Sequence, residues 1–231
     1  MSTLLQGLIE AIHLIAARDE ALTQIAALSL RVSALALVIS TLLGVPVGAA
    51  LGLTRSPFHG LITAVLYTGM GLPPVVVGLF VYLMLSRSGP LGVLSWLFTP
   101  KAMVTAEVVI AWPLVTGLTM TSVRGVDPAL RLQVRSLGAT RIQEAWAVLL
   151  EARIGVVAAI VAAFGSIISE VGAVMLVGGD IEGKTRVLTT AIVLSARMGD
   201  FAQGMALGII LLLLAFLANV ALLRLQGRTV R

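Results

Sequence analysis

The chain has 231 residues, of which 58% are hydrophobic and only 12% charged, and its mean hydropathy of +1.06 excludes an ordinary soluble domain and predicts an integral membrane protein. Its net charge of +5 comes largely from arginines beside apolar runs without interleaved aromatic residues, which favours anionic lipid headgroups or an anionic partner over nucleic acid. The absence of cysteine excludes disulfides, thiolate metal sites and iron–sulfur clusters, and two isolated histidines do not make a metal centre.

The N-terminal region is predicted to contain one short and one long apolar helix. Residues 2–17 carry an apolar pattern that is too short to span a bilayer and lacks the basic start and cleavage site of a secretory signal, so we predict an interfacial helix there. The first membrane span begins between Leu22 and Leu30 and ends at Leu53. Small residues recur within it from Gly44 to Gly52, which is typical of a helix that packs closely against a neighbour.

A second span, Leu61 to Leu85, has two consecutive prolines at its centre. Pro73 and Pro74 lack the N–H groups that continue a helix, so the span must break near the middle of the bilayer, where a broken helix is tolerated only beside protein or water. Residues 69–78 are therefore a candidate lining of a transport pathway, as broken helices are in transporters. The alternative is a packing kink without function.

Three further spans are predicted at Met103–Val123, Ile154–Val177 and Phe201–Leu223. Two of them contain a carboxylate, Glu107 in the third span and Glu170 in the fourth. A charge in the bilayer interior costs at least about 2.5 kcal/mol, so each is either a functional group or one partner of a structural pair with an arginine or a hydroxyl. The predicted fold class is an all-α polytopic membrane protein with five transmembrane helices, or six if residues 2–17 also span.

The longest polar interval runs from Asp127 to Arg153 and is predicted to form two short helices. Asp127 is a typical N-cap, Gly138 ends the first helix, and Thr140 caps the second with Gln143 completing a capping box. Each helix has an apolar stripe, and the stripe of the first helix lies opposite Arg131 and Arg135. The stripe of the first helix consists of Leu130, Val134 and Leu137, and that of the second of Ile142, Ala145, Trp146 and Leu149. This pattern suits docking onto another protein, and a linker lying among lipid headgroups is the alternative.

Arginines set the predicted orientation. If the central interval is cytoplasmic, five spans place the Arg55 loop and the C-terminus on the same side. Nine of the 16 Lys and Arg residues are then cytoplasmic: Arg55, Arg124, Arg131, Arg135, Arg141, Arg153, Arg224, Arg228 and Arg231. The positive-inside rule favours this arrangement, which puts the N-terminus outside.

Residues 178–185 read GGDIEGKT and satisfy the phosphate-loop pattern, with Lys184 and Thr185 as the nucleotide and magnesium ligands. The context opposes nucleotide binding. A membrane span precedes the motif instead of a buried strand, few soluble residues follow it, and Asp180 and Glu182 would face the phosphates. We therefore predict a Gly-rich turn that leads into a short half-buried helix, Val187 to Met198.

The central interval resembles the coupling loop of binding-protein-dependent ABC importer permeases, whose pattern is Glu, Ala, Ala, three residues, Gly, nine residues, Ile, one residue, Leu, Pro. Gly138 matches the glycine, Val148 stands for the isoleucine and Leu150 matches the leucine. The departures are Leu132, Gln133, Val134 and Glu151, which occupy the Glu, Ala, Ala and Pro places.

The order of segments along nearly the whole chain is similar to that of molybdate and tungstate permeases. The segments are Gly44–Gly52, GLPPVVVG, DPALRLQVRSLGAT, SEVGAVMLVGG and GKTRVLTTAI. The GLPP and GGDIEGKTRVLTTAI stretches are most similar to tungstate permeases.

This resemblance implies a channel subunit, a single permease domain over residues 1–231, in an ATP-driven oxyanion importer of a prokaryotic inner membrane. Tungstate is the first expectation, and molybdate or another oxyanion is the alternative. The subunit would form a homodimer, dock on two copies of a separate ATPase through a cytoplasmic loop at 127–153, and receive its substrate from an extracytoplasmic binding protein. No enzymatic activity and no cofactor are expected in the chain itself.

Two groups of residues are expected to carry this function. The residues expected to couple to the ATPase are Arg135, Leu137, Gly138, Ala139 and Trp146. The residues expected in the translocation path and gate are Pro73, Pro74, Glu170, Val171 and Gly172. Because a carboxylate repels an oxyanion, Glu170 is expected to brace a hinge or gate.

Two other classes of protein remain open at this point. An ion-coupled secondary transporter would use an intramembrane carboxylate such as Glu170 and would work without an ATPase. A membrane NTPase would bind nucleotide through Lys184 in the isolated chain.

Overall fold

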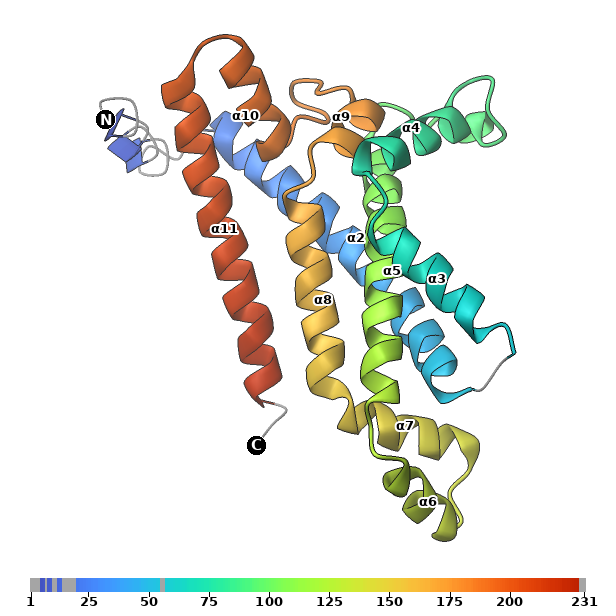
Figure 1. The fold of residues 1–231 in the computed structure, drawn as a ribbon. Helices are drawn as coiled ribbons and strands as arrows, with labels where there is room; N and C mark the ends of the chain where they lie inside the picture. Colours follow the sequence, from blue (N-terminus) through green and yellow to red (C-terminus); the bar gives the residue numbers. More distant parts are fainter. Residues whose placement is uncertain (1–4, 7, 10–11, 14–19, 55–56, 229–231) are drawn as a thin grey trace. The chain divides into compact units, whose positions relative to one another are not determined.

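In the computed structural model, residues 5–6, 8–9, 12–13, 20–54 and 57–228 are described, and all regular structure in these ranges is helical (Figure 1). The elements are α2 (Glu20–Leu53), α3 (His59–Met70), α4 (Pro74–Leu85), a 3₁₀ turn η1 (Gly92–Leu94), α5 (Pro100–Arg124), α6 (Pro128–Ser136), α7 (Arg141–Glu151), α8 (Arg153–Ile168), α9 (Gly172–Gly178), α10 (Leu188–Arg197) and α11 (Phe201–Arg228). The predicted all-α class is confirmed. The interfacial helix predicted for residues 2–17 falls mostly outside the described residues.

Several of these helices are long and apolar enough to cross a membrane. α2, α5 and residues 201–222 of α11 meet this criterion singly, and the pairs α3 with α4 and α7 with α8 meet it as bent spans. The described part of the chain therefore contains three to five candidate spans. The first, second, third and fifth predicted spans correspond to α2, the α3–α4 pair, α5 and α11, with α3 and α4 as the two halves of the span that the prolines interrupt.

The fourth predicted span is not continuous. We predicted one helix from Ile154 to Val177, but α8 ends at Ile168 and α9 begins at Gly172. The Ser169 hydroxyl donates to the carbonyl oxygens of Gly165 and Ser166, and the Glu170 side chain accepts from the Ala173 N–H. Side chains that satisfy main-chain groups in this way replace the helical hydrogen bonds, so the ladder is interrupted without a proline.

The chain forms two compact units, each with its own packing. The first comprises Met1–Ala36, Pro73–Glu107 and Gly165–Ala221. One apolar cluster in it joins α2, α10 and α11 and contains Leu22, Leu188, Ala191, Ala206, Leu207 and Ile210. In the same unit α4 lies against α9, where a Cβ added to Gly78 would come within 2.6 Å of the Ala173 Cα. Glycine is therefore required for this approach of the two backbones.

The second unit comprises Leu37–Leu72, Val108–Phe164 and Leu222–Arg231. The small residues predicted to allow close packing do so here, because Gly44, Gly48 and Gly52 all face α5. A Cβ on Gly48 would lie 2.5 Å from the carbonyl oxygen of Thr116. A second apolar cluster ties α7 and α8 to α2 and α5 through Ala49, Val123, Val148, Ala152 and Val156.

Candidate coupling and translocation residues

The polar interval after α5 folds into a hairpin of α6 and α7, as its sequence predicts (Figure 1). The Asp127 carboxylate accepts a 2.8 Å hydrogen bond from the N–H of Ala129, with Pro128 as the first residue of α6. Thr140 and Gln143 form a reciprocal capping box at the start of α7. These caps satisfy N–H groups that the first turn of a helix leaves without partners, which fixes where each short helix begins.

Gly138 makes the turn between the two helices. Its φ of +82° is a left-handed conformation that side chains other than glycine rarely adopt. The N–H of Gly138 donates to the Arg135 carbonyl and that of Ala139 to the Val134 carbonyl. This pair of bonds is a Schellman motif, so Gly138 and Ala139 set the geometry of the hairpin turn.

A buried carboxylate that sequence reasoning missed holds the two helices together. Glu144 is only 4% exposed, and its two oxygens accept 2.7 Å hydrogen bonds from the Nε atoms of Arg131 and Arg135. The Arg131 guanidinium also donates to the carbonyl oxygen of Leu53, the last residue of α2. This cluster of Glu144, Arg131, Arg135 and the Leu53 carbonyl, here called the Glu144 clamp, joins α6, α7 and the end of α2.

The charges of the clamp stabilise one another. The hydrogen bonds from Arg135 and then Arg131 hold the pKa of Glu144 below its ordinary value, and the bond to Glu144 raises the pKa of Arg135. The sequence had suggested a solvent-facing arginine stripe, but both arginines turn to Glu144. The available signal was that Glu144 is the only carboxylate between Asp127 and Glu151 in an arginine-rich interval.

The hairpin leaves large apolar side chains open. Leu137 is 87% exposed, Ile142 82% and Trp146 65%, whereas Val148 on α7 is fully buried. α7 therefore presents one side to the core of its unit and leaves another side uncovered. Exposed apolar side chains that lie together are typical of a surface that binds another protein.

The predicted path residues lie at the starts of α4 and α9, which meet in the first unit. Pro73 is the N-cap of α4 and Pro74 its first residue, and Val171 is the N-cap of α9. A Cβ added to Gly172 would lie 2.6 Å from a methyl group of Val75, so these two helix starts are in contact. We call the contact of residues 73–75 with residues 170–173 the α4–α9 junction.

Glu170 makes two hydrogen bonds at this junction. Its Oε1 atom accepts a 2.9 Å hydrogen bond from the N–H of Ala173 in the first turn of α9. Its carbonyl oxygen accepts a 2.9 Å bond from the hydroxyl of Thr189 on α10. The residue thereby fixes the end of α8, the start of α9 and the start of α10 together.

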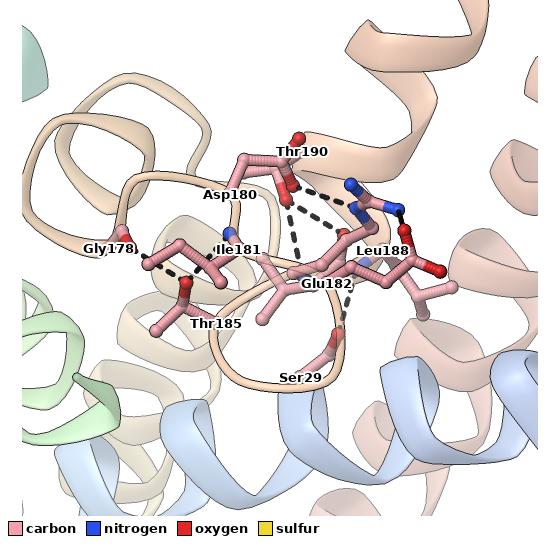
Figure 2. A network of polar contacts seen from close by, with 10 residues as sticks. Ser29, Gly178, Asp180, Ile181, Glu182, Thr185, Leu188 and Thr190 are labelled. Carbon is pink, nitrogen blue, oxygen red and sulfur yellow. Dashed lines mark hydrogen bonds and ion pairs between the residues drawn. The ribbon is translucent and has the colours of Figure 1, made fainter. Parts of the chain in front are cut away.

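In the GGDIEGKT segment, the Thr185 hydroxyl is already engaged in hydrogen bonds within the loop (Figure 2). The Thr185 hydroxyl, on a residue that is 1% exposed, donates to the Gly178 carbonyl at 2.7 Å and accepts from the Ile181 N–H at 2.9 Å. Asp180 and Glu182 pair with Arg186. The hydroxyl that would bind magnesium is therefore buried and used inside the loop, which agrees with the prediction of a turn.

The loop also fixes the start of α10. Figure 2 shows Ser29 of α2 reaching the first N–H of that helix, at Leu188, with a 2.9 Å hydrogen bond. The Thr190 hydroxyl accepts from the N–H of Val187. These contacts anchor α10, the predicted short half-buried helix, to α2.

Residues 44–231 match the family model described as "Binding-protein-dependent transport system inner membrane component". A probable anion ABC transporter permease of Haloferax volcanii is 44% identical over 90% of this chain and 92% of its own length. A tungstate uptake system permease of Peptoclostridium acidaminophilum is 36% identical over 98% of this chain and 99% of its own length. A molybdenum transport system permease of Escherichia coli is 30% identical over 71% and 75%.

A solved structure of a methionine ABC transporter in an inward-facing conformation shares the fold. Its TM-score is 0.77 at 18% identity, and the match covers 92% of this chain and 98% of that one. The three relatives above are named as permeases, so the chain is a transport component and not an enzyme. The chain belongs to the family of inner membrane components of binding-protein-dependent transport systems.

Proposed function

We propose that this chain is the channel-forming subunit of an ABC importer for an oxyanion, and that the oxyanion is tungstate. The observation that carries this proposal is the 36% identity to a tungstate uptake permease over 98% of the chain, compared with 30% over 71% for a molybdenum permease. Molybdate is the nearest alternative. The GLPP and GGDIEGKTRVLTTAI stretches, which resemble tungstate permeases, favour the first.

The working transporter would contain two copies of this chain, two copies of a separate ATPase and an extracytoplasmic binding protein. The family description supports the binding protein, and the names of the relatives as ABC permeases support the ATPase. The homodimer follows from the resemblance of the chain to permeases of this type. High-affinity recognition of the oxyanion would belong to the binding protein.

The α6–α7 hairpin would lie in the cytoplasm and dock onto the ATPase. Leu137, Ile142 and Trp146 are the exposed apolar side chains that would enter the ATPase surface, with Gly138 and Ala139 holding the turn. The Glu144 clamp supplies a mechanical route away from that surface. A displacement of α7 would pull on Glu144, then on Arg131, and so on the end of α2 at Leu53.

The α4–α9 junction is the candidate gate of the translocation path. The first turns of α4 and α9 meet there, and neither helix has a side-chain hydrogen bond from its N-cap residue. Broken helices line the substrate pathway in many transporters. Pro73 and Pro74 would fix the direction of α4, and Val171 and Gly172 that of α9. Because the Glu170 carboxylate is bound to the Ala173 N–H, we assign it a bracing role and not a role in binding the anion.

Reconstitution tests the proposal directly. The purified chain is placed in liposomes with or without the ATPase, and uptake of tungstate, molybdate and sulfate is measured with the binding protein outside and ATP inside. We expect tungstate uptake that requires both ATP and the ATPase. Uptake driven by an ion gradient without the ATPase would instead identify a secondary transporter, and preferential molybdate uptake would replace the substrate assignment.

The docking surface has its own test. Replacing Leu137 with Asp places a charge in the proposed apolar contact, so copurification of the ATPase should be lost while the variant chain remains folded. Gln133→Ala, at an exposed polar position of α6, is the matched control and should retain the ATPase. Full retention of the ATPase by Leu137→Asp would contradict the assigned surface.

A further inference from the structure

A small polar cavity lies inside the first unit. Its volume is about 10 Å³, close to the space that one water molecule or one dehydrated ion occupies. It is lined by Ser29 and Ser33 of α2, Glu107 of α5, Ile167 and Ile168 of α8, Thr189 of α10, and by Glu170 and Val187, which lie between helices. Four separate segments of the unit therefore contribute polar residues to one small space.

Glu107 is the least satisfied group in this cavity. The residue is 3% exposed, and its Oε1 atom receives only a long 3.4 Å hydrogen bond from Ser33. Its Oε2 atom is buried and has no hydrogen-bond partner among the described residues. A buried carboxylate without donors is costly, and either a proton or a bound cation relieves that cost.

The hydroxyl groups around the cavity have already used their protons. Ser33 donates to Glu107, Thr189 donates to the Glu170 carbonyl, and Ser29 donates to the Ile25 carbonyl while accepting from the Leu188 N–H. What Ser33 and Thr189 can still offer to the cavity is oxygen lone pairs. A bound water would find acceptors for its two protons but no donor for its own oxygen, whereas a cation needs only acceptors.

The charge balance points the same way. The lining contains two carboxylates, Glu107 and Glu170, and no lysine, arginine or histidine. One oxygen of Glu170 accepts from the Ala173 N–H, whereas the Oε2 atom of Glu107 has no donor among the described residues, so Glu107 is the less satisfied of the two carboxylates. The space is too small for the water molecules that magnesium retains.

We propose that this cavity is a binding site for one dehydrated monovalent cation of the size of sodium. Glu107 is its charged ligand, and the oxygens of Ser33, Thr189 and Glu170 complete it. The bound ion joins α2, α5 and α10 to the break between α8 and α9, and so stabilises the segment that contains Glu170. The site is independent of which anion the protein transports.

Thermal unfolding of the full chain in lipid nanodiscs tests the site. The Tm is measured in sodium chloride and in N-methylglucamine chloride at equal ionic strength. We expect the wild-type Tm to rise by several degrees with sodium and to saturate, because a ligand that binds only the folded state stabilises it in proportion to its occupancy. Glu107→Gln keeps the shape but removes the charge, so it should lose this response and should be no less stable than the wild type without sodium.

Glu151→Gln is the matched control, because Glu151 is an exposed carboxylate outside the cavity, and it should respond to sodium as the wild type does. A wild-type Tm that is equal in the two salts, or a full response in Glu107→Gln, would overturn the proposal. If Glu107→Gln does not fold, Ser33→Ala serves in its place, since it removes one oxygen without changing the charge. It should raise the sodium concentration at the midpoint severalfold, and an unchanged midpoint would also overturn the site.

Discussion

Replacing Glu144 with Gln should loosen the α6–α7 hairpin without unfolding the rest of the chain. Both guanidinium groups of the clamp lose their negative partner, and the new amide NH₂ group faces N–H donors. A hydrogen bond to a charged group contributes about 1.5–3 kcal/mol, and the Arg131 side chain is 32% exposed, which lowers that value. We therefore expect a loss of about 1–2 kcal/mol from the Arg131 bond, with a smaller further loss at Arg135, whose side chain is 56% exposed.

Hydrogen exchange measures this loss locally. If the amides of α6 and α7 exchange through opening of the hairpin, a loss of 1–2 kcal/mol accelerates their exchange about 5–30-fold. In the assembled transporter the same variant should hydrolyse more ATP for each anion transported, because force on the hairpin no longer reaches α2. Glu151→Gln, at an exposed site on α7, should change neither quantity. Unchanged exchange in Glu144→Gln would refute the role of the clamp.

Three further predictions concern pH, helix packing and the loop at residues 178–185. The arginines hold the pKa of Glu144 below its ordinary value. The stabilising effect of the Glu144 carboxylate is therefore complete above the unfolded carboxyl pKa of about 4.3 and is lost as the pH falls through the folded pKa. The difference in Tm between the wild type and Glu144→Gln should accordingly shrink in acid. Gly48→Val should cost about 1–3 kcal/mol or more by forcing α2 from α5, whereas Gly60→Ala, with no atom near its added Cβ, should leave the denaturation midpoint unchanged. Thr185→Val should cost about 1–3 kcal/mol for each main-chain group that it leaves unsatisfied. Lys184→Ala should leave the Tm unchanged, and neither the wild type nor this variant should bind nucleotide in an equilibrium binding assay.

Features that depend on neighbouring residues in the chain were predictable from the sequence. The caps at Asp127 and Thr140, the turn at Gly138 and the interruption at Pro73 and Pro74 all appear where the sequence places them. Each is decided by one residue type and the few residues beside it, because caps, left-handed turns and proline breaks act within a single turn of helix. The turn predicted for residues 178–185 also forms, and that prediction depended on the missing strand and not on the motif itself.

Features that depend on contacts between distant segments were not predictable in the same way. The Glu144 clamp joins residues that are 9, 13 and 78 positions apart, counting from Arg135 and Arg131 to Glu144 and from Arg131 to Leu53. An arginine beside an apolar stripe can be either exposed to solvent or paired with a buried carboxylate. Hydrophobic periodicity shows on which face of a helix a side chain lies, but not which residue it contacts. Only the fold distinguishes these two cases.

The break after Ile168 shows how a single carboxylate can be misread for the same reason. In a hydrophobic run, Glu170 was interpreted as a charge inside a continuous helix, and its cost was assigned to function or pairing. Its side chain instead accepts from the Ala173 N–H, so the carboxylate ends one helix and begins another. Start signals for helices are sought where apolar runs begin, but here the signal lies within one. A carboxylate two residues before a glycine inside an apolar run should therefore be tested first as the start of a second helix, because that arrangement satisfies both its charge and the free N–H groups of the next turn.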